Sequence, residues 1–102
     1  MENNNSIQLA KLKQLLEGKP KKVKIIDVRS EEEFNQQHIP NAENIQLPQL
    51  ITKEFITHTE EIIITVCTHG GGRSQNAAQA LKEKGIKNVY FLEGGTAGWF
   101  EE

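Results

Sequence analysis

The sequence predicts a single α/β domain in which a central, mainly parallel β-sheet is flanked by helices. Its 102 residues suit one compact domain and no more. Short runs rich in β-branched residues alternate with helical patterns, as they do when strands and crossover helices follow one another. No internal repeat, linker or low-complexity segment divides the chain, so we expect residues 1–102 to form one domain.

The N-terminal part predicts a helix followed by a strand. Residues 1–5 are polar and are expected to fray. Ser6 is predicted to cap a helix, which Gly18 and Pro20 bring to an end. Residues 23–28 read VKIIDV and indicate a buried strand, because β-branched residues dominate the run.

The next segment contains a helix start and a proline-containing connection. Ser30 and Glu33 have the spacing of a capping box, which predicts a short helix after them. Residues 38–47 are expected to lead to a short strand near residues 44–46. Residues 47–55 fit a helix or an irregular segment, and the pattern does not choose between them.

The second half contains the clearest structural unit. Residues 61–66 read EIIITV, a nearly continuous apolar run typical of a central parallel strand that is covered on both faces. Residues 67–73, CTHGGGR, follow as a tight loop, and residues 74–85 predict a helix closed by a glycine. Residues 89–92, VYFL, predict another strand, and residues 93–99 lead into the end of the chain.

Cys67 is the candidate nucleophile because it stands at the carboxyl end of the most hydrophobic strand, where open α/β sheets bind ligands. Successive glycines let backbone N–H groups turn inward around an anion. The start of the following helix adds partial positive charge. These features favour the thiolate, which is the nucleophilic form. A small buried cysteine with only a packing role is the alternative. The predicted anion-binding loop consists of Thr68, His69, Gly70, Gly71, Gly72 and Arg73.

Two further residues are expected to support this loop. Asp27 and Arg29 lie at the end of the strand predicted over residues 23–28, which faces the same edge of the sheet. We interpret them as an ion pair or a loop brace, with contact to substrate as the lesser alternative.

Composition limits the partners that the protein is expected to have. A single cysteine excludes a disulfide framework and a multi-cysteine metal site, and we expect neither a metal nor a cofactor. The net charge of -2 gives no reason to expect nucleic acid or an anionic membrane as a partner. Apolar runs are too short to span a bilayer, and residues 1–6 lack the features of a secretory signal, so we expect a cytoplasmic location.

Three motifs resemble the rhodanese family, in the family's order. Residues 27–47, DVRSEEEFNQQHIPNAENIQL, are similar to its Asp-Val-Arg to His-Ile-Pro signature. CTHGGGRS from Cys67 resembles its active-site loop, and EGGTAGW at residues 93–99 resembles its C-terminal motif. The resemblance implies a rhodanese-like fold. It also implies that a sulfane sulfur passes from thiosulfate or a related small-molecule donor, through a Cys67 persulfide, to a thiol or cyanide-like acceptor or to a protein acceptor.

One departure from the family leaves other functions open. Five residues separate Cys67 from Arg73, whereas the usual rhodanese loop has four. The longer spacing is that of rhodanese-fold phosphatases and arsenate reductases, although those enzymes usually have histidine where Val66 stands. A non-catalytic docking module and a persulfide carrier are further alternatives. Sulfur transfer is preferred, because no positioned acid is evident for protonating an alkoxide leaving group.

Overall fold

The computed structural model describes residues 5–19, 22–52 and 61–101. Five strands and five helices are assigned within these residues. The strands are β1 (Ser6–Ile7), β2 (Val23–Asp27), β3 (Glu43–Asn44), β4 (Ile62–Val66) and β5 (Val89–Leu92). The helices are α1 (Leu9–Gly18), α2 (Glu31–Gln36), α3 (Leu47–Thr52), α4 (Gly72–Glu83) and α5 (Gly95–Glu101).

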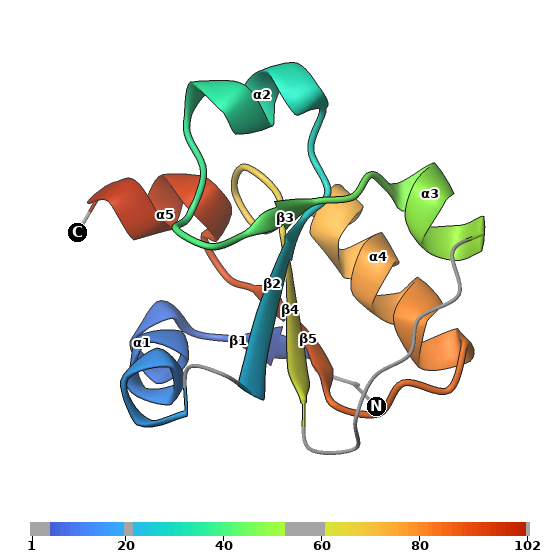
Figure 1. Ribbon diagram of the computed structural model, residues 1–102, viewed down its shortest axis with the longest axis horizontal. Coiled ribbons are helices and arrows are strands. Elements are labelled where there is room, and N and C mark those ends of the chain that lie inside the picture. The colour runs from blue at the N-terminus through green and yellow to red at the C-terminus, as the bar shows by residue number, and fades with distance from the viewer. Residues whose placement is uncertain (1–4, 20–21, 53–60, 102) are drawn as a thin grey trace.

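The strands form one sheet in the order β1-β5-β4-β2-β3, and all the strand pairs are parallel. The helices α1 and α5 lie on one side of this sheet and α3 and α4 on the other (Figure 1). The predicted α/β fold with a central parallel sheet is therefore confirmed.

The core has two halves, because successive side chains of a strand point to opposite faces of the sheet. Ile63 belongs to the cluster that contains Leu50 of α3 and Leu81 of α4. Ile64 belongs to the cluster that contains Leu12 of α1. All five of these side chains are fully buried. Strand β4 is thus covered on both faces, which explains why its sequence is apolar without alternation.

The predicted helix cap at Ser6 is wrong. Ser6 and Ile7 form strand β1, which pairs with Phe91 and Leu92 of β5, and α1 starts only at Leu9. The carbonyl of Asn5 accepts a hydrogen bond from the Phe91 amide, so Asn5 is not part of a frayed head. Burial of Ile7 and these ladder bonds outweigh the weak local preference for a cap. Residues 1–4 lie outside the described residues.

Other boundaries differ from the expectations by small amounts. The segment that the sequence left open forms helix α3 over its first six residues, and residues 53–60 lie outside the described residues. Strand β3 begins one residue and ends two residues before the expected segment 44–46, which is an ordinary uncertainty of element ends. Helix α5 was not predicted, because the glycines of EGGTAGW disfavour a helix in isolation.

The capping box at the start of α2 is confirmed. The Glu33 amide donates to Ser30 Oγ at 3.2 Å, and the Ser30 amide donates to Glu33 Oε1 at 3.0 Å. This box fixes the orientation of the Glu33 carboxylate beyond the carboxyl ends of the strands, where α2 lies in Figure 1.

Candidate active site

Cys67 follows β4 directly and is buried, with 3% of its surface exposed. Its sulfur lies 3.2 Å from the hydroxyl oxygen of Ser74, a fully buried residue in the first turn of α4. Side chains of a helix tilt toward its N-terminus, so Ser74 points back to the loop from which the helix emerges. The Thr65 hydroxyl donates to the Ser74 carbonyl at 2.8 Å and so ties the start of α4 to β4.

The environment of Cys67 stabilises its thiolate. Burial raises the pKa of the Cys67 thiol, but hydrogen bonds from the Ser74 hydroxyl and from the amides of Ser74, Gly71 and Gly70 lower it further than burial raises it. The net effect is a pKa below the ordinary value. Amides in the first turn of a helix have no intrahelical acceptor, so they are available to an anion. The site can therefore hold a negatively charged sulfur atom.

Of the three successive glycines, Gly70 is the one that requires glycine. Its φ is +77°, and an added Cβ would lie 2.8 Å from both the Gly94 amide nitrogen and the Leu92 carbonyl oxygen. A Cβ at Gly71 or Gly72 would meet nothing within 4 Å. Of the three glycines predicted to let the backbone turn around an anion, only Gly70 therefore has a positive φ.

Helix α5 holds the Cys67 loop in place. The Thr96 amide donates to the Cys67 carbonyl and the Ala97 amide to the Thr68 carbonyl, both at 2.9 Å. Gly95 has a φ of +59°, and a Cβ there would lie 2.6 Å from the Thr68 carbonyl oxygen. The C-terminal EGGTAGW motif thus holds the backbone of the candidate loop through hydrogen bonds.

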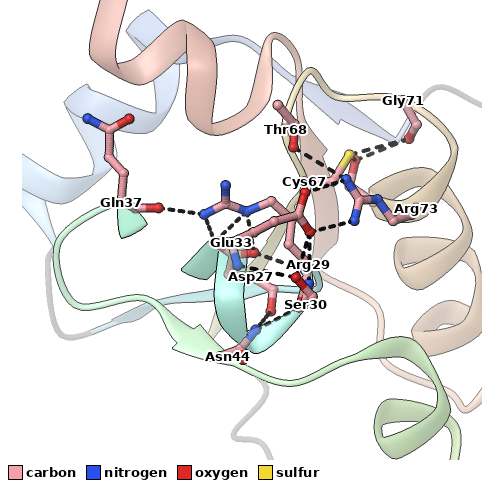
Figure 2. Close-up of polar contacts among 11 residues, drawn as sticks. Asp27, Arg29, Ser30, Glu33, Gln37, Asn44, Cys67, Thr68, Gly71 and Arg73 are labelled. Carbon is pink, nitrogen blue, oxygen red and sulfur yellow. Dashed lines mark hydrogen bonds and ion pairs between the residues drawn. The ribbon is translucent and has the colours of Figure 1, made fainter. Parts of the chain in front are cut away.

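Asp27 and Arg29 form a buried brace. Arg29 Nη2 donates to Asp27 Oδ2 at 2.8 Å and to the Gln37 carbonyl at 2.6 Å. The Asn44 side-chain amide donates to the carbonyls of Asp27 and Arg29. This network joins the ends of β2, α2 and β3, and Figure 2 shows the side chains directed at one another. The geometry fits the interpretation of both residues as a structural ion pair.

Arg73 lies at the rim of the loop and is half exposed. Its guanidinium donates to Glu33 Oε1 at 3.0 Å, to Glu33 Oε2 at 3.4 Å and to the Thr68 hydroxyl at 3.3 Å (Figure 2). The predicted loop included Gly72 and Arg73, but both residues belong to the first turn of α4, and the structure pairs Arg73 with a carboxylate. His69 is exposed at the same loop.

Sequence reasoning missed two of these residues. Ser74 directly follows Arg73 in the first turn of a helix, and the tilt of helical side chains toward the N-terminus could have identified it. Glu33 was identified only as a helix cap. Its contact with Arg73 joins residues 40 positions apart, and no local pattern predicts such a contact.

Neither a metal site nor a membrane-spanning helix is found among the described residues. No group of three or more His, Cys, Asp or Glu side chains in residues 5–19, 22–52 and 61–101 could hold a metal ion. In the same residues no helix combines the length and the apolar character needed to cross a membrane.

Comparisons with known proteins agree on one family. Residues 8–102 match the family described as Rhodanese-like domain. The chain is 36% identical over 101 residues to the thiosulfate sulfurtransferase GlpE of Shewanella oneidensis, an alignment that covers 99% of this chain and 97% of that protein.

Two solved structures have similar folds. A rhodanese-related protein from Thermoplasma volcanium superposes with a TM-score of 0.79 and 30% identity, covering 95% of this chain and 91% of that one. The human single-domain sulfurtransferase TSTD1 gives a TM-score of 0.84 over 98% of each chain at 24% identity, which supports the fold.

Proposed function

This chain belongs to the rhodanese-like domain family, and on that premise we propose that it carries sulfane sulfur as a persulfide on Cys67. The protein is a rhodanese-type sulfurtransferase. In our proposal the donor is thiosulfate or a related compound, and the acceptor is a thiol, cyanide or a similar nucleophile. The observation that carries the proposal is the position of Cys67 directly after β4, where its sulfur lies 3.2 Å from the Ser74 hydroxyl oxygen among loop donors that lower the pKa of the thiol.

The reaction has two displacement steps. The Cys67 thiolate attacks the outer sulfur of thiosulfate, a bond forms between the two sulfurs, and the original S–S bond breaks with its electron pair leaving on sulfite. The acceptor then attacks the outer sulfur of the Cys67 persulfide, and the electron pair of that S–S bond returns to Cys67 as thiolate. The acceptor leaves with the sulfur, for example as thiocyanate when it is cyanide.

Each step produces negative charge at a position that the loop can stabilise. The amides of Gly70, Gly71 and Ser74, together with the Ser74 hydroxyl, already lower the pKa of the Cys67 thiol. The same donors would stabilise a persulfide anion, because preorganised donors favour the charged species. Sulfite is a good leaving anion, so the first step needs no acid to protonate the leaving group.

The Cys-x5-Arg spacing supports a second candidate, a phosphatase or arsenate reductase on the same fold. Such chemistry uses an arginine to bind the tetrahedral anion bidentately. Here the Arg73 guanidinium is paired with Glu33, which makes this candidate the weaker one. A docking module needs no reactive thiol, so the lowered pKa of Cys67 counts against it. A persulfide carrier shares the first step and differs only in its donor.

The test compares two activities in three proteins. We expect the parent to form thiocyanate from thiosulfate and cyanide and to leave an aryl phosphate intact. Cys67→Ala should lose sulfur transfer while keeping its circular dichroism spectrum, since the sequence has no other thiol. A variant lacking Gly72 has the usual loop spacing and should keep or gain transfer. Efficient phosphate-ester hydrolysis by the parent, lost on the deletion, with negligible transfer in both, would establish a phosphatase instead.

A further inference from the structure

Glu33 and Arg73 form an ion pair between α2 and α4 at the rim of the Cys67 loop. Both guanidinium Nη atoms are engaged, Nη1 with Glu33 Oε1 and Nη2 with Glu33 Oε2 and the Thr68 hydroxyl. A fork of two N–H groups is also what arginine uses to bind a phosphate or sulfonate group bidentately. Glu33 therefore occupies the Nη1–Nη2 edge of Arg73, one of the two forked edges through which an arginine binds an oxyanion.

The Glu33 carboxylate is fixed before any ligand arrives. The Ser30 amide and hydroxyl both donate to Glu33 Oε1 at 3.0 Å, as part of the capping box of α2. The hydrogen bond from Arg73, followed by that from the Ser30 amide, lowers the pKa of Glu33 to about 2. The carboxylate is thus ionised at any physiological pH, and the ion pair with Arg73 is not a pH switch in that range.

The Glu33–Arg73 ion pair determines which positively polarised groups at the loop remain available to an anionic ligand. Glu33 neutralises Arg73, so the backbone amides and the start of α4 are left to stabilise a ligand. These donors converge on one atom, the sulfur of Cys67. They suit a sulfur anion, whereas a tetrahedral oxyanion such as phosphate or the sulfonate part of thiosulfate gains from a second, forked cation.

We propose that Glu33 determines the donor specificity of the site by keeping Arg73 from binding oxyanions. The loop then favours sulfane donors whose leaving group is a thiolate over donors whose leaving group is an oxyanion. The favoured donor class is a thiol persulfide, RS–SH. The Cys67 thiolate attacks its outer sulfur, a new S–S bond forms, and RS⁻ leaves with the electron pair of the old bond. This inference rests on the proposed function, because it assigns the donor class of the same site.

The first experiment measures oxyanion binding without any sulfur transfer. The rate at which iodoacetamide alkylates Cys67 is measured at increasing concentrations of inorganic phosphate. The phosphate concentration that halves this rate is recorded. Glu33→Gln removes the charge but keeps the capping box, since glutamine also serves at that position. We expect phosphate to bind about fivefold more tightly to Glu33→Gln, the order of one exposed ion pair.

Control variants separate this effect from general charge and folding effects. Glu32→Gln removes a like charge from the same turn of α2, where Glu32 is exposed, and should change phosphate binding by less than about twofold. In an Arg73→Gln background, Glu33→Gln should give no gain, because the two residues act as a pair. The melting temperature of Glu33→Gln is measured alongside that of Glu32→Gln, and equal values show that the gain in phosphate binding does not come from a change in folding.

The second experiment measures donor choice. The KM for thiosulfate should fall about fivefold in Glu33→Gln, while kcat/KM for a low-molecular-weight thiol persulfide stays within about twofold. If phosphate protects Cys67 of Glu33→Gln no better than it protects the parent, the proposal is overturned. Glu33 would then either have no effect on anion binding by Arg73 or would assist it. Absence of sulfur transfer in every protein would instead refute the proposed function, and the phosphate titration would still report on Glu33.

Discussion

The reactivity of Cys67 depends on the atoms that face its sulfur. Burial alone would make the thiol less acidic, as it does for a cysteine with only a packing role. Here the donors of Ser74 and the loop reverse that effect, and the pKa falls below the ordinary value. Ser74 is the single side chain among these donors, so it is the residue at which the thiolate can be tested without removing the nucleophile.

Replacing Ser74 with alanine should move the alkylation of Cys67 to higher pH. The pKa of Cys67 lies below its ordinary value partly because the Ser74 hydroxyl donates to the thiolate, so removing the hydroxyl raises that pKa. At pH values below the parent's midpoint the iodoacetamide rate should fall about tenfold, because a hydrogen bond to a charged group contributes about 1.5–3 kcal/mol. The measurement is the alkylation rate as a function of pH.

Thr96→Val is the matched control for Ser74→Ala. Thr96 is also buried beside the loop, but within the described residues its hydroxyl has no hydrogen-bond partner. Its removal should leave the alkylation midpoint in place. An equal shift in both variants, or no shift in Ser74→Ala, would show that the hydroxyl of Ser74 does not stabilise the thiolate.

Individual residues differ in how far the sequence could predict them. Cys67 and its glycine loop were identified because strand, loop and helix follow one another along the chain. The Asp27–Arg29 ion pair was likewise expected, since the two residues are two positions apart. Glu33 could not be assigned to Arg73, because α2 and α4 come together only when the sheet has formed.

Among the elements, the Cys67 loop and α5 act as one unit. The amides of Thr96 and Ala97 bind loop carbonyls, and the close approach of the loop backbone leaves no space for a side chain at Gly95. At Gly70, the neighbouring backbone that leaves no space is that of residues 92–94, between β5 and α5. The resemblance to a C-terminal family motif indicated that EGGTAGW matters, but not that it forms a helix or what that helix contacts.

Gly70→Ala should lower the stability of the protein, whereas Gly72→Ala should not. At Gly70 the positive φ and the contacts with Leu92 and Gly94 should lower the free energy of unfolding by about 2 kcal/mol or more. At Gly72, in the first turn of α4, alanine meets open space and should leave stability unchanged or raise it by up to about 1 kcal/mol. Urea denaturation measures both values. Equal losses in the two variants would contradict this description of the loop.

The elements that the sequence predicted well are those whose pattern is set by burial on both sides. The EIIITV run identified β4 as central, and the sheet order places it in the middle. Ser6 and Ile7 were misassigned because their partner, β5, lies more than 80 residues away in sequence. A two-residue edge strand has too short a pattern to compete with the helical spacing that follows it.

The molecule as a whole places one reactive sulfur where its sheet and two helices meet. The parallel sheet brings the ends of β2 and β4 to one edge, where the Val28 amide donates to the Val66 carbonyl. The buried Asp27–Arg29 ion pair lies at the end of β2, and the amides of Thr96 and Ala97 in α5 bind the carbonyls of the Cys67 loop. In our proposal, the sulfur atom of Cys67 is the one that carries the transferred sulfur.

Intact-protein mass spectrometry after incubation with a sulfane donor tests this directly. With thiosulfate or a thiol persulfide, the parent protein should gain the mass of one sulfur atom, a reductant should remove it, and Cys67→Ser should gain none. The added sulfur should also disappear on addition of cyanide, with thiocyanate formed in equal amount. A parent protein that gains no sulfur from either donor, or a Cys67→Ser variant that gains as much as the parent, would contradict the assignment of Cys67 as the sulfur carrier.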